Sequence, residues 1–311
     1  MENKLMNSVT TRVYSVDFFL AILGYSLFVI MDSIAKELTN YYHVTQIIFI
    51  NSISALLPIL LYTQVRNSWK KIKTKNLLVH LVRAVTIIIS MGLFFLCINK
   101  LPLTTMYSII FFTPFVLTIG SVIFLKEKVS WRRYTAILVG FIGTIIAINP
   151  FGKEINNYVL LALLIPVFAS VGHLLVKKYG QSESVYSFLI IGKLILILIS
   201  GVITFELYIP MTKTDFFLNF NSGLLRGMGM IFIINSARHL PASIFANTQY
   251  IQLLIGALIG FYIFNEIPTW NIYLGNVFII GAGVYIVLRE IKLSRNIVSN
   301  SIRPTTISIK K

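Results

Sequence analysis

The chain has 311 residues, of which 56% are hydrophobic and only 12% are charged, and its mean hydropathy is +0.81. A soluble domain of this size would carry roughly a quarter of its residues as Asp, Glu, Lys or Arg, so the composition indicates an integral membrane protein. The high apolar content also excludes a disordered or collagen-like chain. Cys97 is the only cysteine, which excludes an intrachain disulfide.

Ten apolar segments are long enough to cross a bilayer, since a spanning helix needs about 20 apolar residues. They lie near residues 14–36, 44–65, 77–99, 104–125, 131–149, 157–176, 185–209, 219–238, 242–264 and 270–288. The first segment is predicted to be a retained helix, because no small-residue cleavage site follows a short apolar core. We therefore predict an all-α polytopic membrane protein with ten transmembrane helices.

The cations predict the orientation. If the N-terminus is cytoplasmic, 20 of the 27 Lys and Arg residues lie in inner segments, and four lie outside: Lys36, Lys100, Lys153 and Lys213. This asymmetry predicts a multi-pass protein of the cell (inner) membrane with both termini in the cytoplasm. The basic inner loops should attract anionic membrane lipids. The net charge of +16 does not indicate nucleic-acid binding, because the cations fall between apolar runs and not on one basic face.

The chain also contains an internal repeat. The matches at an offset of 139 residues and at an offset of 141 residues include charged residues and tryptophans, which are harder to match by chance than apolar ones. At 139 they are Leu101-Pro102 with Leu240-Pro241, Glu127 with Glu266, and Trp131 with Trp270; at 141 they are Asp32 with His173 and Lys36 with Lys177.

Each repeat holds five predicted helices, and an odd number places the second copy upside down in the membrane. We predict a first repeat at 15–150, a second at 156–290 and a basic cytoplasmic tail at 291–311. Inverted repeats of this kind build transporters whose solute binds near the bilayer midplane between the two halves. The repeat therefore predicts alternating access from the two sides of the membrane.

The stretch from Arg83 to Ile148 resembles an EamA-type domain of the drug/metabolite transporter superfamily, and Arg226 to Leu288 resembles a second copy. The shared pattern is a helix-opening arginine, an LP dipeptide, a helix that ends in glutamate and then a glycine-spaced helix. The resemblance implies a fold of five plus five helices and secondary transport of a small organic solute, driven by a gradient or by exchange.

The chain also resembles the S-adenosylmethionine carriers of intracellular bacteria, which suggests an amino acid, a nucleotide-like metabolite or an S-adenosylmethionine-type solute. Members of the superfamily often carry an arginine early in the second helix. This chain has Phe49-Ile50-Asn51 there, which makes Asn51 a candidate substrate contact and means that a relative's substrate cannot simply be carried over.

Lys193 is the leading candidate for substrate binding. It lies about eight residues into its helix, hence roughly 12 Å deep at 1.5 Å per residue. An ammonium at that depth is costly unless it faces a partner or a watery cavity, so we predict a functional role. The alternative is a structural pair with Asp32 or Glu206. Cations outnumber carboxylates within the spans, which favours a solute with a carboxylate or phosphate.

Asp32 and His173 are candidates for proton coupling, because histidine titrates close to neutral pH. The alternative for both is an interfacial or helix-capping side chain.

A polar band forms a second candidate binding surface. Gln249 and Gln252 share one face of the ninth helix, next to Tyr250, and the repeat places them opposite Tyr107 of the fourth. We predict that they line a cavity, although such amides also hold helices together in lipid.

Four further charges are candidates of lower rank. Arg83 and Arg226 open their helices, where a long side chain can reach the headgroups, or else bind the solute. Glu127 and Glu266 end their helices, each followed by an interfacial tryptophan. They are predicted to be topological anchors or, as a repeat-related pair, gating residues.

No sequence motif for catalysis, metal binding or a cofactor is present, since HExxH, CxxC, GxSxG and a P-loop are all missing. We therefore predict a transporter and not an enzyme, with no metal and no cofactor. The alternatives are a non-transporting scaffold or sensor and, less favoured, a membrane-embedded enzyme. Assembly as a homodimer is left open.

Overall fold

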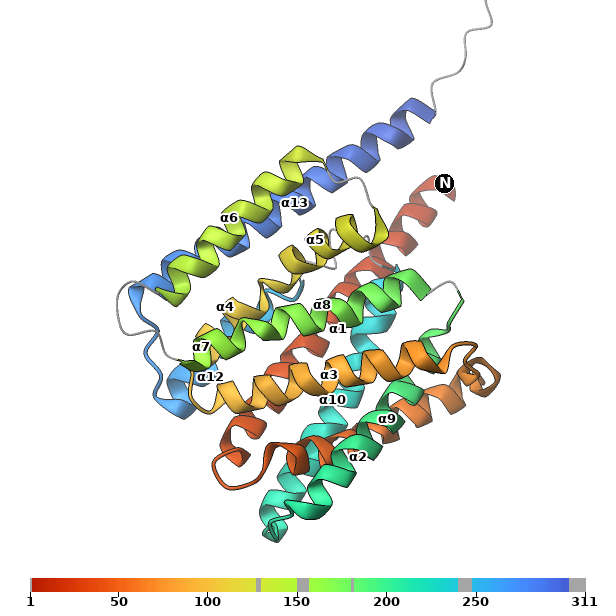
Figure 1. Cartoon of the computed structure of the whole chain (residues 1–311). Helices are drawn as coiled ribbons and strands as arrows, with labels where there is room; N and C mark the ends of the chain where they lie inside the picture. Colours follow the sequence, from red (N-terminus) through yellow and green to blue (C-terminus); the bar gives the residue numbers. More distant parts are fainter. Residues whose placement is uncertain (1, 127–129, 150–156, 180–181, 240–247, 302–311) are drawn as a thin grey trace, which may run out of the picture.

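The computed structural model describes residues 2–126, 130–149, 157–179, 182–239 and 248–301. Every regular element within these ranges is a helix (Figure 1). The elements are α1 (Glu2–Leu38), α2 (Val44–Val65), η1 (Trp69–Ile72), α3 (Leu77–Ile98), α4 (Leu103–Ile110), α5 (Thr113–Leu125), α6 (Trp131–Ile148), α7 (Asn157–Ala162), α8 (Leu164–Tyr179), α9 (Val185–Glu206), α10 (Lys213–His239), α12 (Ile251–Phe264) and α13 (Trp270–Ser301).

Seven helical segments among the described residues are long and apolar enough to cross a membrane. They are Val16–Leu38, Val44–Val65, Leu77–Ile98, Leu103–Leu125, Asn157–Val176, Val185–Glu206 and Lys213–Ser236. The other predicted spans coincide with α6, α12 and α13. The apolar stretches Tyr134–Ile148 and Ile251–Phe264 are shorter than a full span. The all-α polytopic fold is confirmed, and the number of ten spans stays a prediction.

Two predicted spans are not continuous helices. The fourth span breaks at Phe111–Phe112 into α4 and α5, and the sixth breaks at Leu163 into α7 and α8. Each break lies two or three residues before a proline, Pro114 or Pro166. Proline has no N–H and its ring clashes with the preceding turn, so the helix cannot continue unchanged through that position.

The eighth span begins earlier than the predicted residue 219. Helix α10 begins at Lys213, because the Thr212 hydroxyl accepts a hydrogen bond of 3.1 Å from the backbone N–H of Asp215 and caps the first turn. The polar residues of this turn lowered the hydropathy on which the prediction rested.

The helices pack in pairs across the bundle. Helices α6 and α13 run side by side at one edge, and α2 packs against α9 at the opposite edge (Figure 1). Between these edges α1 packs along α10, and α3 along α8. A Cβ at Gly143 would lie 2.8 Å from the carbonyl oxygen of Gly275, so α6 and α13 approach with backbones in contact. Small residues permit such contact in lipid, where van der Waals packing drives helix association.

Helix α10 also packs tightly on α2. A Cβ at Gly223 would collide with the Ser54 hydroxyl and with the carbonyl oxygen of Asn51. The same contact positions a hydrogen bond of 2.9 Å from the Asn51 amide to the Ser222 hydroxyl. The α2–α10 contact therefore depends on glycine at this position.

We predict that Gly223→Ala lowers the free energy of unfolding by about 1–3 kcal/mol, the usual cost of overpacking a close contact. Thermal unfolding of the purified protein in detergent measures the effect. Gly92→Ala is the matched control, because a Cβ at Gly92 meets nothing within 4 Å. A Gly223 variant as stable as the Gly92 variant would show that the two helices are not held this closely.

Candidate functional site

Lys193 of α9 lies inside the bundle together with two arginines. It is 7% exposed, and the charges that act on it are those of Arg226 and Arg83. A Cβ at Gly192, the residue before Lys193, would lie 3.1 Å from Nη1 of Arg83, so the guanidinium rests against the backbone of α9. Among the described residues, Lys193 has neither a hydrogen bond nor an ion pair from its side chain. Three cations from α3, α9 and α10 thus share one region.

The two arginines have few acceptors. Arg83 donates from Nη1 to the carbonyl oxygen of Phe188 at 3.1 Å and lies over the Phe188 ring, while its Nε is buried without a hydrogen-bond partner. Nη1 of Arg226 lies 3.2 Å from the thioether sulfur of Met91, a weak acceptor. Both guanidinium groups therefore contact residues of neighbouring helices.

Arg226 also interacts with a carboxylate, that of Asp32. Asp32 of α1 is 7% exposed, and it accepts a hydrogen bond of 3.0 Å from the Tyr107 hydroxyl of α4. Arg226 is the charge that acts on Asp32. Tyr107 in turn lies against α12, where a Cβ at Gly256 would approach its ring to 2.6 Å. Helices α1, α4, α10 and α12 meet at this contact.

His173 of α8 lies at the Arg83 end of the cluster. Its side chain is exposed, and Arg83 is the charge that acts on it. Arg83 and Arg226 are themselves only partly buried, so accessible surface lies beside the cations. Six of the predicted site residues form one series across six helices, which we call the charged cluster: His173, Arg83, Lys193, Arg226, Asp32 and Tyr107. Their roles stay predictions.

The predicted polar band is only partly brought together. Gln252 is buried on α12, one turn before Gly256 and therefore on the face of α12 that meets Tyr107. Tyr250 stacks on Phe111, with ring centroids 5.1 Å apart and an interplanar angle of 26°. Gln249 lies in the turn that precedes α12. Of the two predicted glutamines, Gln252 is thus the one on the α12 face that contacts Tyr107 of the charged cluster.

Asn51 is not part of the cluster. Asn51 is fully buried and bonded to Ser222 in the α2–α10 contact, which is the environment of a packing residue. Glu127 lies outside the described residues.

Glu266 joins three segments on the face that the sequence assigns to the outside. Its Oε1 is 2.5 Å from the Lys36 ammonium, and its Oε2 accepts a hydrogen bond of 2.8 Å from the backbone N–H of Leu103. Lys36 also donates to the carbonyl oxygen of Leu101 at 2.8 Å. We call these contacts between α1, the α3–α4 connection and the residue after α12 the outer latch.

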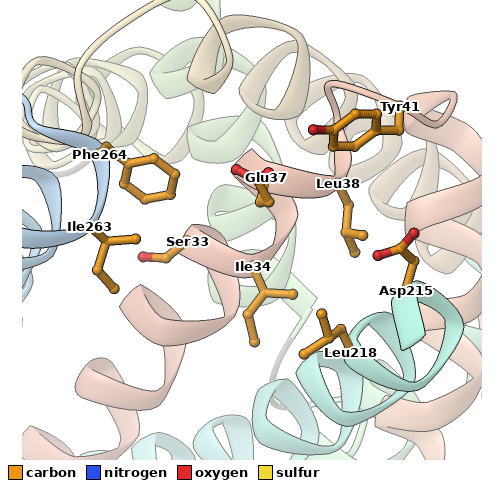
Figure 2. Close-up of a pocket in the computed structure, with 9 residues that line it drawn as sticks. All are labelled: Ser33, Ile34, Glu37, Leu38, Tyr41, Asp215, Leu218, Ile263 and Phe264. Carbon is orange, nitrogen blue, oxygen red and sulfur yellow. The ribbon is translucent and has the colours of Figure 1, made fainter.

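Next to the outer latch is a hollow of about 300 Å³ between α1, α10 and α12. In Figure 2 one face of α1 lies between Ile263 and Phe264 on one side and Asp215 and Leu218 on the other. Asp215 is fixed there by hydrogen bonds from the hydroxyls of Tyr42, at 2.6 Å, and Thr212, at 2.7 Å. The hollow is walled mainly by apolar side chains, with carboxylates at its rim.

A second polar tie lies on the face assigned to the inside. The carboxylate of Glu183, just before α9, accepts hydrogen bonds from the backbone N–H groups of Lys75 and Asn76 at 2.8 and 2.9 Å and from His80 at 3.2 Å. Burial by itself would raise the pKa of Glu183, but these hydrogen bonds outweigh it and lower the pKa to about 2. Glu183 thus fixes the start of α9 to the start of α3.

We predict that acid weakens this tie. The folded pKa of Glu183 lies below its ordinary value near 4.5, so the stabilisation is present above that value and is lost as pH falls towards about 2. Thermal unfolding in detergent between pH 7 and pH 3 measures it. Glu183→Gln should lower the midpoint by about 2–4 °C at pH 7 and reduce the acid-dependent loss. Glu206→Gln, which alters an exposed carboxylate, is the control. Equal acid sensitivity of the Glu183 variant and the native chain would contradict the role of this carboxylate.

Sequence reasoning missed Glu183, His80 and the pairing of Lys36. For Lys36 the repeat gave a signal. Lys36 and Glu266 both lie at the predicted outer face, and their repeat counterparts Lys177 and Glu127 both lie at the predicted inner face. Glu183 gave no comparable signal. Within the described ranges, no three His, Cys, Asp or Glu residues are grouped closely enough to hold a metal ion.

Comparison with known proteins agrees with this architecture. Residues 17–149 match the model of the EamA-like transporter family. Several known transporters are similar over most of their length, so the likeness extends well beyond the part matched by the family model.

One such relative is an S-adenosylmethionine uptake transporter of Rickettsia prowazekii, 26% identical over 85% of this chain and 89% of its own. Another is a pseudopaline exporter of Pseudomonas aeruginosa, 26% identical over 89% and 95%. A third is a riboflavin transporter of Vibrio cholerae, 25% identical over 86% and 91%. A solved crystal structure superposes with a TM-score of 0.64 over 91% of this chain and 99% of its own, at 13% identity, which supports the fold alone.

Proposed function

We propose that the protein is an alternating-access secondary transporter of a small polar organic solute in the cell inner membrane, with proton coupling or exchange as its driving force. The charged cluster is the observation that carries this proposal. Six polar groups from six helices meet within the spanning segments, beside accessible surface, and Lys193 has no partner among the described residues. Intramembrane charges in that state mark a substrate pathway. The names of the relatives described above, which are transporters of several metabolites, support the same class.

The proposal includes ten spans in two inverted halves, 15–150 and 156–290. The most extensive helix contacts support it, because they recur when every span is exchanged for its counterpart in the other half. Under this exchange the contact of α1 with α10 becomes the contact of α8 with α3. The contact of α2 with α10 becomes the contact of α9 with α3. The pairs α2 with α9, α4 with α12 and α6 with α13 exchange with themselves. A two-fold axis in the membrane plane has this effect.

Matching helix breaks support the position of the solute site. The fourth span breaks at Phe111–Phe112, and in the ninth Gln249 and Tyr250 form a turn directly before α12. Phe111 and Tyr250 are separated by the repeat offset of 139 and stack on each other. Interrupted helices at corresponding positions of two halves are typical of transporter binding sites. The charged cluster lies on the spans that flank these breaks.

The outer latch is proposed to be the closed outer gate. It joins α1 to the α3–α4 connection and to Glu266, and its two charged side chains are only 10% and 14% exposed. Removing one partner of such a pair leaves the other charge poorly solvated, so the closed state loses stability. His173, on the inner side, is exposed in the same structure.

We predict that Lys36→Met and Glu266→Gln each increase access from outside. The reporter is Ser33→Cys in a Cys97→Ala background, because Ser33 lines the hollow beside the latch. A membrane-impermeant maleimide should label it about fivefold faster, since about 1 kcal/mol changes an equilibrium by that factor. Lys100→Gln, an exposed cation on the same face, should leave the rate unchanged. Identical labelling rates in all variants would refute the gate.

Transport itself is tested in proteoliposomes. Vesicles that contain the purified full chain are loaded with a panel of labelled amino acids, nucleosides and S-adenosylmethionine, with and without a proton gradient. Saturable counterflow of one solute is expected, and Lys193→Gln should abolish it while the protein stays in the membrane. A well-inserted Lys193→Gln variant with native flux would rule out Lys193 as a substrate contact. Chemical conversion of a solute without flux would instead indicate an enzyme.

A further inference from the structure

The charged cluster has more positive than negative charge. It contains three cations, Arg83, Lys193 and Arg226, and one carboxylate, Asp32. Asp32 faces Arg226 and accepts from Tyr107. The charges that act on Lys193 are both positive, and the charge that acts on His173 is that of Arg83. Among the residues that the structure describes, two cations of the cluster therefore lack a negative counterpart.

The other carboxylates with contacts described above are engaged elsewhere. Glu266 is paired with Lys36 in the outer latch, and Glu183 is bonded to His80 and to two backbone N–H groups near the inner face. Asp215 is held by two hydroxyls at the rim of the outer hollow. None of these carboxylates acts on Lys193.

Hydrogen-bond donors without acceptors also indicate a missing anion. Nε of Arg83 is buried without a partner, Nη1 of Arg226 faces only a thioether, and the Lys193 ammonium has no hydrogen bond to a described residue. A buried cation without a partner is strongly destabilising, and guanidinium groups bind carboxylates and phosphates through two parallel hydrogen bonds. A bound anion would supply the missing acceptors and charge.

We infer that the charged cluster is an anion-binding site and that the transported solute carries about two negative charges, on carboxylate or phosphate groups, and at most one cationic group. This inference rests on the proposed transport function. The anionic groups bind between Arg83 and Lys193, and a single ammonium on the solute would lie towards Asp32. S-adenosylmethionine, with one carboxylate, one ammonium and one sulfonium, has the wrong net charge for this site, so the chain differs in substrate from that relative.

The binding step is tested without knowledge of the solute. Thermal unfolding of the purified full chain is followed against citrate, inorganic phosphate and chloride at matched ionic strength. Citrate or phosphate should stabilise the native protein saturably, while chloride should not. In Lys193→Gln and Arg83→Gln the apparent dissociation constant should rise about thirtyfold or more, the effect of removing one partner of a buried charge pair. Lys100→Gln should bind as the native chain does.

Selectivity is tested in proteoliposomes with labelled succinate, glycerol 3-phosphate, L-glutamine and S-adenosylmethionine. The inference predicts exchange of succinate or of glycerol 3-phosphate. Exchange of succinate would identify the solute as a dicarboxylate, and exchange of glycerol 3-phosphate would identify it as a phosphate ester. The inference is overturned if the native protein shows no anion stabilisation beyond that of chloride, or if L-glutamine or S-adenosylmethionine is exchanged equally well. Anion binding without flux of any solute would leave the site intact and remove the transport function. Flux of S-adenosylmethionine without anion binding would support the transport function and overturn the anion site.

Discussion

A charged side chain within a bilayer must find a counter-charge, a polar partner or water, because its desolvation costs several kcal/mol even after relaxation. The residues packed around the charged cluster meet this requirement in part. Arg83 lies between α8 and α9: a Cβ at Gly172 would be in ordinary van der Waals contact with its Cγ at 4.0 Å, and one at Gly192 would lie closer, 3.1 Å from its Nη1. The Phe188 ring and carbonyl then provide a cation–π contact and one acceptor, which reduce the cost without cancelling the charge.

The same solvent restricts the backbone, since an unsatisfied peptide group in lipid costs several kcal/mol. The break between α4 and α5 shows how this cost is met. Pro114 cannot donate to the carbonyl oxygen of Ile110, and the hydroxyl of Thr113 donates to it instead, at 2.6 Å. The carbonyl of Thr113 accepts from Ser170 of α8 at 3.2 Å. The irregular backbone is therefore covered by a neighbouring helix, and the fourth span can bend beside Tyr107 and its contact with Asp32.

Much of this arrangement follows from the sequence, because hydropathy and length are properties of single segments. The helices were placed well where the apolar run was uninterrupted, as in Val44–Val65, and less well at Lys213, where a polar first turn is capped by Thr212. The depth of Lys193 and the repeat-matched Asp32 and His173 pointed to residues that the structure brings into one series.

Partners that depend on tertiary contacts were not predictable in the same way. The hydrogen bond of Tyr107 to Asp32 and the bond of Glu183 to the Lys75 and Asn76 backbone join residues more than 70 positions apart. Asn51 is a further case: its position in the second helix suggested a substrate contact, which stays a prediction, and only the structure shows that it lies at the close contact of α2 with Gly223.

The difference between the outer latch and the charged cluster gives a physical link between binding and gating. In the latch, Lys36 has a protein carboxylate, so its charge is satisfied whether or not a solute is present. In the cluster, Arg226 has the carboxylate of Asp32, whereas the charges of described residues that act on Lys193 are those of the cations Arg83 and Arg226. These cations lie on α3, α9 and α10, and α10 also packs along α1, the helix that carries Lys36. A ligand shifts a conformational equilibrium only through its different affinity for the two states. Under the proposed transport mechanism, an anion that removes the repulsion among α3, α9 and α10 would favour the state in which these helices are closest, and it would act on α1 and its latch through the α1–α10 contact.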